Sequence, residues 1–141
     1  LSMKRKAHVV WRGDGENGKG ELTTGSGALK NLPYDFKMRF QNDDGKLGTN
    51  PEELIAAAHA GCFNMKLSFV LNENGFSPEI LETESVLTFV DGVVESIDLS
   101  LSAKVSDITK EKFSECANVA KENCPISGLL NCKISLNSAL I

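Results

Sequence analysis

The chain has 141 residues, enough for one domain that buries its own core without disulfides or metal. Its composition is 41% hydrophobic, 24% charged and 6% aromatic, which excludes a disordered chain or a coiled coil. The net charge of −4 and the lack of a Lys/Arg cluster argue against a nucleic-acid partner, and the apolar runs look too short to span a membrane.

The N-terminal part of the chain is predicted to be rich in β-strands. Residues 7–12 and 20–26 have the composition of two strands, and the four glycines within residues 13–20 are typical of a hairpin turn. A third strand is predicted over residues 35–41, because apolar and charged side chains alternate there.

A long helix with a clear start follows. Asn50 can cap it, Pro51 suits its first turn, and the carboxylates of Glu52 and Glu53 complement the positive end of the helix dipole. The helix is predicted to end near residue 74, before Gly75. Because its body is apolar most of the way round, we expect it to be fully buried, with the help of a second subunit.

The C-terminal half is predicted to alternate strands and helices. Two long strands, 80–90 and 93–105, are joined by Asp91-Gly92, which is a strong hairpin signal. A second helix is predicted over residues 109–123, where Phe113 and neighbouring apolar residues share one side.

Pro125 marks the end of that second helix. The residue before a proline avoids the helical region, and Pro125 can itself open a short helix over residues 125–131. A last strand is predicted over residues 132–140, with Cys132 and Ile134 on its apolar face. The sum is an α+β fold.

The N-terminus gives no sign of an export signal, because no apolar segment follows the charged residues after Met3. Leu1-Ser2 are expected to be a remnant of cloning. No repeat or linker interrupts the chain. We therefore expect a single cytosolic domain over residues 1–141.

The four cysteines differ in their settings. Cys116 and Cys132 lie on apolar faces and are expected to be buried, as free cysteines often are. Cys124 precedes Pro125, where the N-terminus of a short helix would stabilise a thiolate.

Cys62 lies in the middle of the long helix, where a thiolate would need a nearby cation. Lys66 is one turn further along the helix, and Arg39 is the better candidate if its segment crosses that helix. On these residues alone a core role for Cys62 also stays open. His59 is interpreted as a polar neighbour of the core.

Two motifs resemble one family. Residues 48–64, which read GTNPEELIAAAHAGCFN, closely resemble the central helix of the OsmC/Ohr hydroperoxide reductases, and the Cys124-Pro125 pair resembles their second hallmark. The resemblance covers nearly the whole chain, and residues 11–14 and 33–40 are similar to the OsmC branch.

This resemblance implies a fold and a set of roles. The fold would be α+β and OsmC-like, with strongly curved antiparallel sheets around two central helices, in an intertwined homodimer with its active sites at the subunit interface. Cys62 would be the peroxidatic thiol and Cys124 the resolving thiol. Arg39 would hold the Cys62 thiolate, and Glu52 would orient Arg39.

The implied reaction is the reduction of hydroperoxides in defence against oxidative or osmotic stress. Cys62 would be oxidised to a sulfenic acid, and Cys124 would convert it to a disulfide. An external dithiol would then reduce that disulfide, and the resemblance implies that this dithiol is of lipoyl type. No cofactor is expected. Apolar neighbours of Cys62, such as Met65 and Phe40, favour organic hydroperoxides over hydrogen peroxide.

Three alternatives stay open at this stage. A redox sensor would use the same cysteines to signal, and a binding domain would keep them buried and inert. A metal-binding protein would need an unusual ligand set, since His8 and His59 are the only histidines and no C-x-x-C motif is present.

Overall fold

The N-terminal part of the chain is an antiparallel sheet of three strands: β1 (Ala7–Arg12), β2 (Lys19–Thr24) and β3 (Leu32–Tyr34). The predicted hairpin is confirmed. Trp11 and Tyr34 pack with their ring centroids 5.4 Å apart. A Cβ on Gly20 would lie 2.3 Å from a Tyr34 ring carbon, so only glycine fits between these rings. The computed structural model describes residues 1–141.

The predicted third strand over residues 35–41 is wrong, because this segment forms the helix α1 (Phe36–Phe40). Asp35 caps it by accepting a hydrogen bond of 2.9 Å from the Met38 N–H. Phe36 and Phe40 alternate with charged residues as in a strand. They are also four residues apart, and on one helix face their tilted rings pack with centroids 5.1 Å apart. Hydrogen bonds from Lys19 and from the Met38 N–H hold the pKa of Asp35 below its usual range.

The long helix α2 (Pro51–Glu73) begins and ends where the sequence predicts. The Asn50 side chain accepts a hydrogen bond of 2.8 Å from the Glu53 N–H. At the other end Gly75 takes a positive φ of 87°, and the Phe76 N–H reaches back to the Leu71 carbonyl at 2.9 Å.

The single chain buries only one face of α2, so the expectation that a second subunit completes its burial stays a prediction. Its inner face is buried, whereas Met65 is 65% exposed and Phe69 is 58% exposed. α2 also has the length and hydropathy of a membrane span, which corrects the expectation that all apolar runs are too short. Long helices in a protein core meet the same two criteria. Phe63 and Leu67 of α2 are buried in the core described below.

The second sheet contains β4 (Pro78–Val90), β5 (Val93–Val105) and β6 (Lys133–Leu140), in that order. Asp91 and Gly92 join β4 to β5 with φ values of 48° and 81°, as the hairpin prediction requires. β6 pairs with β5 in parallel, so the antiparallel arrangement expected for the sheets does not extend to this pair. A parallel pair needs a long crossover, and α3 (Lys110–Asn123) and α4 (Pro125–Leu129) supply it.

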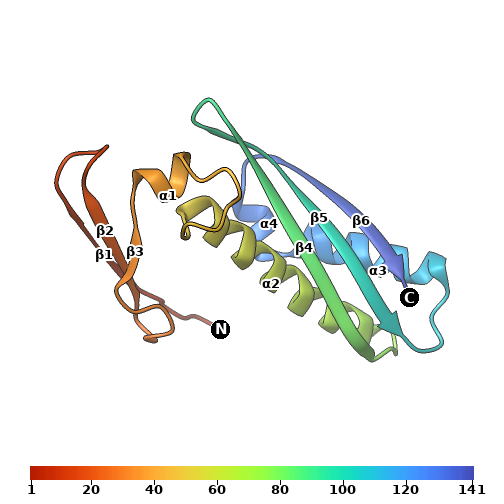
Figure 1. The fold of residues 1–141 in the computed structure, drawn as a ribbon. Helices are drawn as coiled ribbons and strands as arrows, with labels where there is room; N and C mark the ends of the chain where they lie inside the picture. Colours follow the sequence, from red (N-terminus) through yellow and green to blue (C-terminus); the bar gives the residue numbers. More distant parts are fainter. The chain divides into compact units, whose positions relative to one another are not determined.

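The core lies between this second sheet and the two long helices, α2 and α3, which Figure 1 shows on the same side of it. The alternation predicted for β5 is confirmed, since every second residue from Ile97 to Val105 is buried. The buried side chains contributed by the helices are Phe63, Leu67, Val70, Leu71, Phe113, Cys116, Ala117 and Ala120.

The α+β class is confirmed, with one three-stranded sheet in each of two compact units, Leu1–Leu54 and Ile55–Ile141. The single domain expected over residues 1–141 stays a prediction.

Candidate functional site

Cys62 and Cys124 meet in the second unit of the chain. Cys62 lies in the middle of α2, and Cys124 is the residue that precedes α4, as the Pro125 signal predicts. Their Sγ atoms are 2.9 Å apart and both thiols are free. A disulfide bond is about 2.05 Å long, so the two sulfurs are in contact without being bonded. Packing of α4 therefore brings together two thiols that are 62 residues apart.

The surroundings of the two sulfurs shift their pKa values in opposite directions. Burial, followed by the hydrogen bond with Cys124, raises the pKa of Cys62, against the opposing effects of the Ile126 backbone and the Lys66 charge. Burial also raises the pKa of Cys124, but the Cys62 thiol, Ser127 and the Ile126 backbone outweigh it and leave that pKa below its usual range. Within this unit of the chain, Cys124 is the more stable thiolate.

His59 and Ser127 lie beside the cysteine pair, and sequence reasoning gave neither of them a role. His59 is fully buried, and its Nε2 is 2.7 Å from the Ser127 Oγ. Burial lowers the pKa of His59. A signal for both was present in their spacing, because His59 precedes Cys62 by three residues and Ser127 follows Cys124 by three, about one helical turn in each case.

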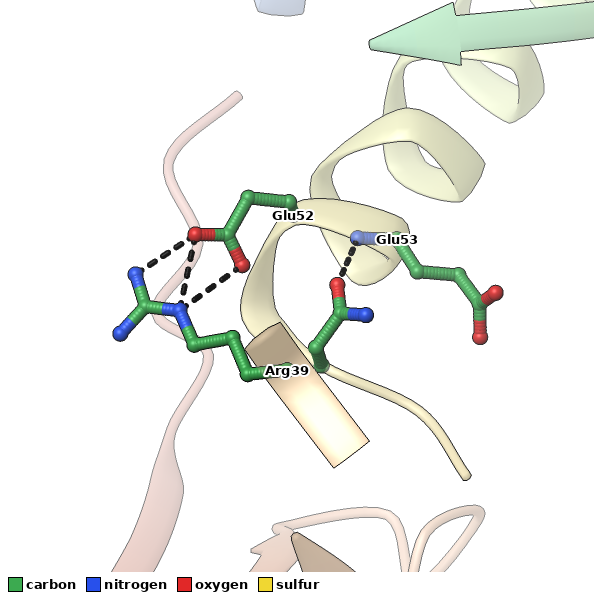
Figure 2. Close-up of polar contacts among 4 residues, drawn as sticks. Arg39, Glu52 and Glu53 are labelled. Atoms are coloured by element: carbon green, nitrogen blue, oxygen red, sulfur yellow. Dashed lines mark hydrogen bonds and ion pairs between the residues drawn. The ribbon is translucent and has the colours of Figure 1, made fainter. Parts of the chain in front are cut away.

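Arg39 and Glu52 form an ion pair in the first unit (Figure 2). The Arg39 Nε lies 2.9 Å from Oε1 and 3.2 Å from Oε2 of Glu52, and Nη2 lies 2.6 Å from Oε1. Arg39 comes from α1 and Glu52 from the first turn of α2. A guanidinium held by two of its nitrogens has a fixed plane, which suits the recognition of an acceptor pair.

The four predicted site residues thus occur as two pairs, Cys62 with Cys124 and Arg39 with Glu52. Each pair belongs to its own compact unit. The orienting contact expected between Glu52 and Arg39 is present, and so is the contact expected between the two thiols.

The remaining cysteines lie apart from this chemistry. Cys116 is buried in the core, as predicted, and burial raises its pKa. Cys132 is half-buried and packs against the same core. The structure holds no group of three or more His, Cys, Asp or Glu side chains that could bind a metal ion.

Known proteins resemble this chain over its full length. A family model described as "OsmC-like protein" matches residues 42–138. Peroxiredoxin OsmC of Escherichia coli strain K12 is 39% identical over 99% of both chains. The organic hydroperoxide resistance protein OhrB of Bacillus subtilis strain 168 is 33% identical, over 77% of this chain and 79% of its own length.

Solved structures agree with these sequence matches. The crystal structure of Bacillus subtilis OhrB aligns with a TM-score of 0.66 at 30% identity, covering 96% of this chain and 98% of that one. An OsmC-like protein of unknown function from Vibrio cholerae aligns with a TM-score of 0.76, covering 98% of this chain and 100% of its own. Because the identity is only 13%, this second match supports the fold and not the function.

Proposed function

The chain belongs to the OsmC-like family, and on that premise we propose that it reduces organic hydroperoxides with Cys62 as the nucleophile and Cys124 as the resolving thiol. The coarser prediction, a hydroperoxide-reducing peroxidase in stress defence, is confirmed by the relatives named peroxiredoxin and organic hydroperoxide resistance protein. The observation that supports the assignment of residues is the 2.9 Å approach of the Cys62 and Cys124 sulfurs.

The proposed reaction has two chemical steps. The Cys62 thiolate attacks one peroxide oxygen, the O–O bond breaks, and the alcohol leaves with a proton, so that Cys62 becomes a sulfenic acid. The Cys124 thiolate then attacks the Cys62 sulfur, the S–O bond breaks, and hydroxide leaves as water after taking up a proton. Because the sulfurs are already within about 3 Å, the second step needs little rearrangement.

The first step requires a cation that stabilises the Cys62 thiolate. Within its own unit the pKa of Cys62 is raised, chiefly by burial, and the charge of Lys66 only partly opposes this. We assign the missing charge to Arg39, whose guanidinium Glu52 already holds in a fixed plane. The same guanidinium would hydrogen-bond the peroxide.

We further propose a homodimer, in which the exposed apolar face of α2 is covered by a second copy. Met65 and Phe69 on that face are each more than half exposed in the single chain. Exposed apolar side chains on a long core helix are typical of an interaction surface. The active sites would then form at the subunit interface, as the family resemblance implies.

The proposed substrates are organic hydroperoxides, with hydrogen peroxide reduced more weakly. Met65 and Phe40, which are 65% and 47% exposed, offer apolar surface to an alkyl or aryl group. The proposed reductant is an external dithiol of lipoyl type, and the proposed location is the cytoplasm. Equal rates with hydrogen peroxide and cumene hydroperoxide would contradict the substrate preference.

A single-turnover experiment tests the reaction. Reduced protein is mixed with one equivalent of cumene hydroperoxide, and peroxide and free thiols are followed together. We expect wild type to consume the peroxide and lose two thiols per chain. Cys62→Ser should be inert, and Cys124→Ser should consume one equivalent and stop as a sulfenic acid.

Cys132→Ser is the matched control, because Cys132 is also half-buried but lies outside the pair, and it should behave as wild type. If wild type left the peroxide and the thiols unchanged, a binding domain with inert cysteines would replace the peroxidase. Cys132→Ser starts with three thiols and should retain one per chain after turnover. If it instead lost only one thiol and stopped as a sulfenic acid, Cys124 would not be the resolving residue.

A further inference from the structure

His59 is a buried titratable group that the two chemical steps do not use. Its side chain is fully buried on the side of α2 that carries Cys62. Its Nε2 lies 2.7 Å from the Ser127 Oγ, while its Nδ1 has no hydrogen-bond partner. A buried imidazole with one unsatisfied nitrogen costs free energy, so this arrangement calls for an explanation.

The orphaned Nδ1 indicates which way the His59–Ser127 hydrogen bond runs. Burial lowers the pKa of His59, so the ring is neutral and carries one proton. Buried N–H groups without an acceptor are rarer in proteins than buried acceptors without a donor. The proton therefore resides on Nε2, which donates to the Ser127 Oγ.

A hydroxyl that accepts this hydrogen bond has its own hydrogen free to donate elsewhere. The Cys124 sulfur makes no close capping contact with α4. The Ser127 hydroxyl and the N–H groups of Ser127 and Ile126 nevertheless lie near enough to the sulfur to favour its thiolate. We call His59, Ser127 and Cys124 the donor chain: Nε2 of His59 contacts the Ser127 Oγ, and Ser127 favours the Cys124 thiolate.

We propose that His59 and Ser127 are positioning residues that keep Cys124 a thiolate once Cys62 has been oxidised, and thereby set the rate of disulfide formation. This inference rests on the proposed function, since it concerns the second step of that reaction.

The donor chain matters most after the first step. In the reduced pair the two sulfurs share a hydrogen bond, and the Cys62 thiol favours the Cys124 thiolate when Cys124 is ionised. Oxidation replaces that S–H by a sulfenic acid, so the S–H is no longer present at the moment when Cys124 must act. Ser127, held by His59, does not depend on the oxidation state of Cys62. The Cys124 thiolate then forms the S–S bond while the S–O bond of the sulfenic acid breaks and water leaves.

Several titratable or charged groups lie beside the Cys124–Ser127 segment. From α2 these are Cys62 and His59, and from α3 Lys121 and Glu122, which line a cavity together with Ser127. The nearby cation, Lys66, affects Cys62. The direct titration of the Cys124 thiolate described below assigns a change in pH dependence to Cys124 rather than to these neighbours.

The test follows the sulfenic acid in a single turnover without reductant, trapping it with dimedone at intervals over a range of pH. We expect Ser127→Ala to slow its conversion to disulfide by about tenfold at neutral pH, as losing a hydrogen bond to a charged group implies. The midpoint of the rate profile should move to higher pH, because the variant Cys124 is a weaker acid. At high pH, where Cys124 is fully ionised, the two rates should converge.

Second variants separate positioning from a structural defect. Ser127→Thr keeps the hydroxyl and should restore the rate, and His59→Gln keeps an N–H donor and should resolve faster than His59→Leu. Combining His59→Leu with Ser127→Ala should be no slower than Ser127→Ala alone, because both act along one path. Ser114→Ala, an exposed serine of α3, is the control.

Two results would overturn the proposal: an unchanged rate and midpoint in Ser127→Ala, or a loss of equal size at every pH. A measurement without peroxide keeps the proposal separate from the peroxidase function. In Cys62→Ser protein the ultraviolet absorbance of the thiolate should titrate at higher pH when Ser127→Ala is added. If it does not, the proposal fails although the peroxidase stands, whereas failure of wild type to consume peroxide removes the proposed function itself.

Discussion

At the scale of single residues, the two reacting cysteines have opposite surroundings. Burial and the neighbouring thiol raise the pKa of Cys62, whereas Ser127 and the Ile126 backbone contribute to a lowered pKa at Cys124. A nucleophile at Cys62 therefore depends on a charge from outside its own unit of the chain, and Arg39 is the residue we propose for it. The resolving thiol, in contrast, has its donors within the same unit.

His59 also makes the stability of the fold depend on pH. Burial holds its pKa below the value of about 6.5 that it has in the unfolded chain. Below about pH 6.5 the unfolded chain therefore binds the extra proton, and the free energy of unfolding falls with pH by at most about 1.4 kcal/mol per unit until the folded pKa is passed. Above about pH 6.5 the contribution of His59 to the free energy of unfolding is fully present.

Urea denaturation of wild type and His59→Leu at one protein concentration, from about pH 8 to pH 5, measures this contribution. The wild type should lose stability more steeply than the variant as the pH falls. The exposed His8 offers a control, since His8→Gln should follow the wild-type curve. Parallel curves for wild type and His59→Leu would contradict the assignment of a neutral, buried His59.

At the scale of elements, α1 determines where Arg39 lies. A helix of five residues cannot persist without tertiary support, because nucleation costs more than so few hydrogen bonds return. Asp35 supplies that support twice, through its cap on the Met38 N–H and through a 2.7 Å ion pair with Lys19. The contact of Arg39 with Glu52 therefore depends on a residue that lies outside the proposed chemistry.

Asp35→Ala should consequently lower the peroxidase rate by about tenfold to a hundredfold, because a small misplacement of a catalytic group has effects of that size. Asp35→Asn retains the capping acceptor, and since Asn caps as well as Asp it should keep most of the rate. Steady-state kinetics of both variants with cumene hydroperoxide, together with their melting temperatures, provide the comparison. Full activity of Asp35→Ala would mean that α1 does not position Arg39.

At the scale of the whole molecule, α2 has one face in the core and another that the single chain leaves exposed. Phe63 and Leu67 are fully buried, whereas Met65 and Phe69 are mostly exposed. This division explains why the helix is apolar around most of its circumference although one chain buries only part of it. A second copy that covers the exposed face would account for the whole pattern.

Phe69→Glu should therefore shift the protein from dimer to monomer and lower its peroxidase rate, because a buried, unpaired carboxylate opposes association. Light scattering coupled to size-exclusion chromatography would measure the mass, and the single-turnover experiment would measure the rate. Ser114→Glu adds the same charge to the exposed side of α3 and should remain dimeric. A monomeric wild type with full activity would contradict the proposed assembly.

The sequence by itself determined the elements whose signals are local. The Asn50 cap and Gly75 bound α2, Asp91-Gly92 forms the hairpin, and Cys124-Pro125 begins α4. Such signals depend only on backbone conformation within a few residues, so they survive any tertiary arrangement. The motifs around Cys62 and Cys124 were also sufficient to identify the family.

Only the tertiary structure decided the contacts between distant residues and the segments whose local signals were ambiguous. Phe36, Met38 and Phe40 fit both a strand and a helix, and the Asp35 cap with its Lys19 partner selected the helix. The spacing of His59 from Cys62 and of Ser127 from Cys124 is a local signal, but the contact between His59 and Ser127, 68 residues apart, arises only from the packing of α4 against α2. The same packing sets the distance between the two sulfurs. It raises the pKa of Cys62 chiefly through burial and lowers the pKa of Cys124 through hydrogen bonds that outweigh burial.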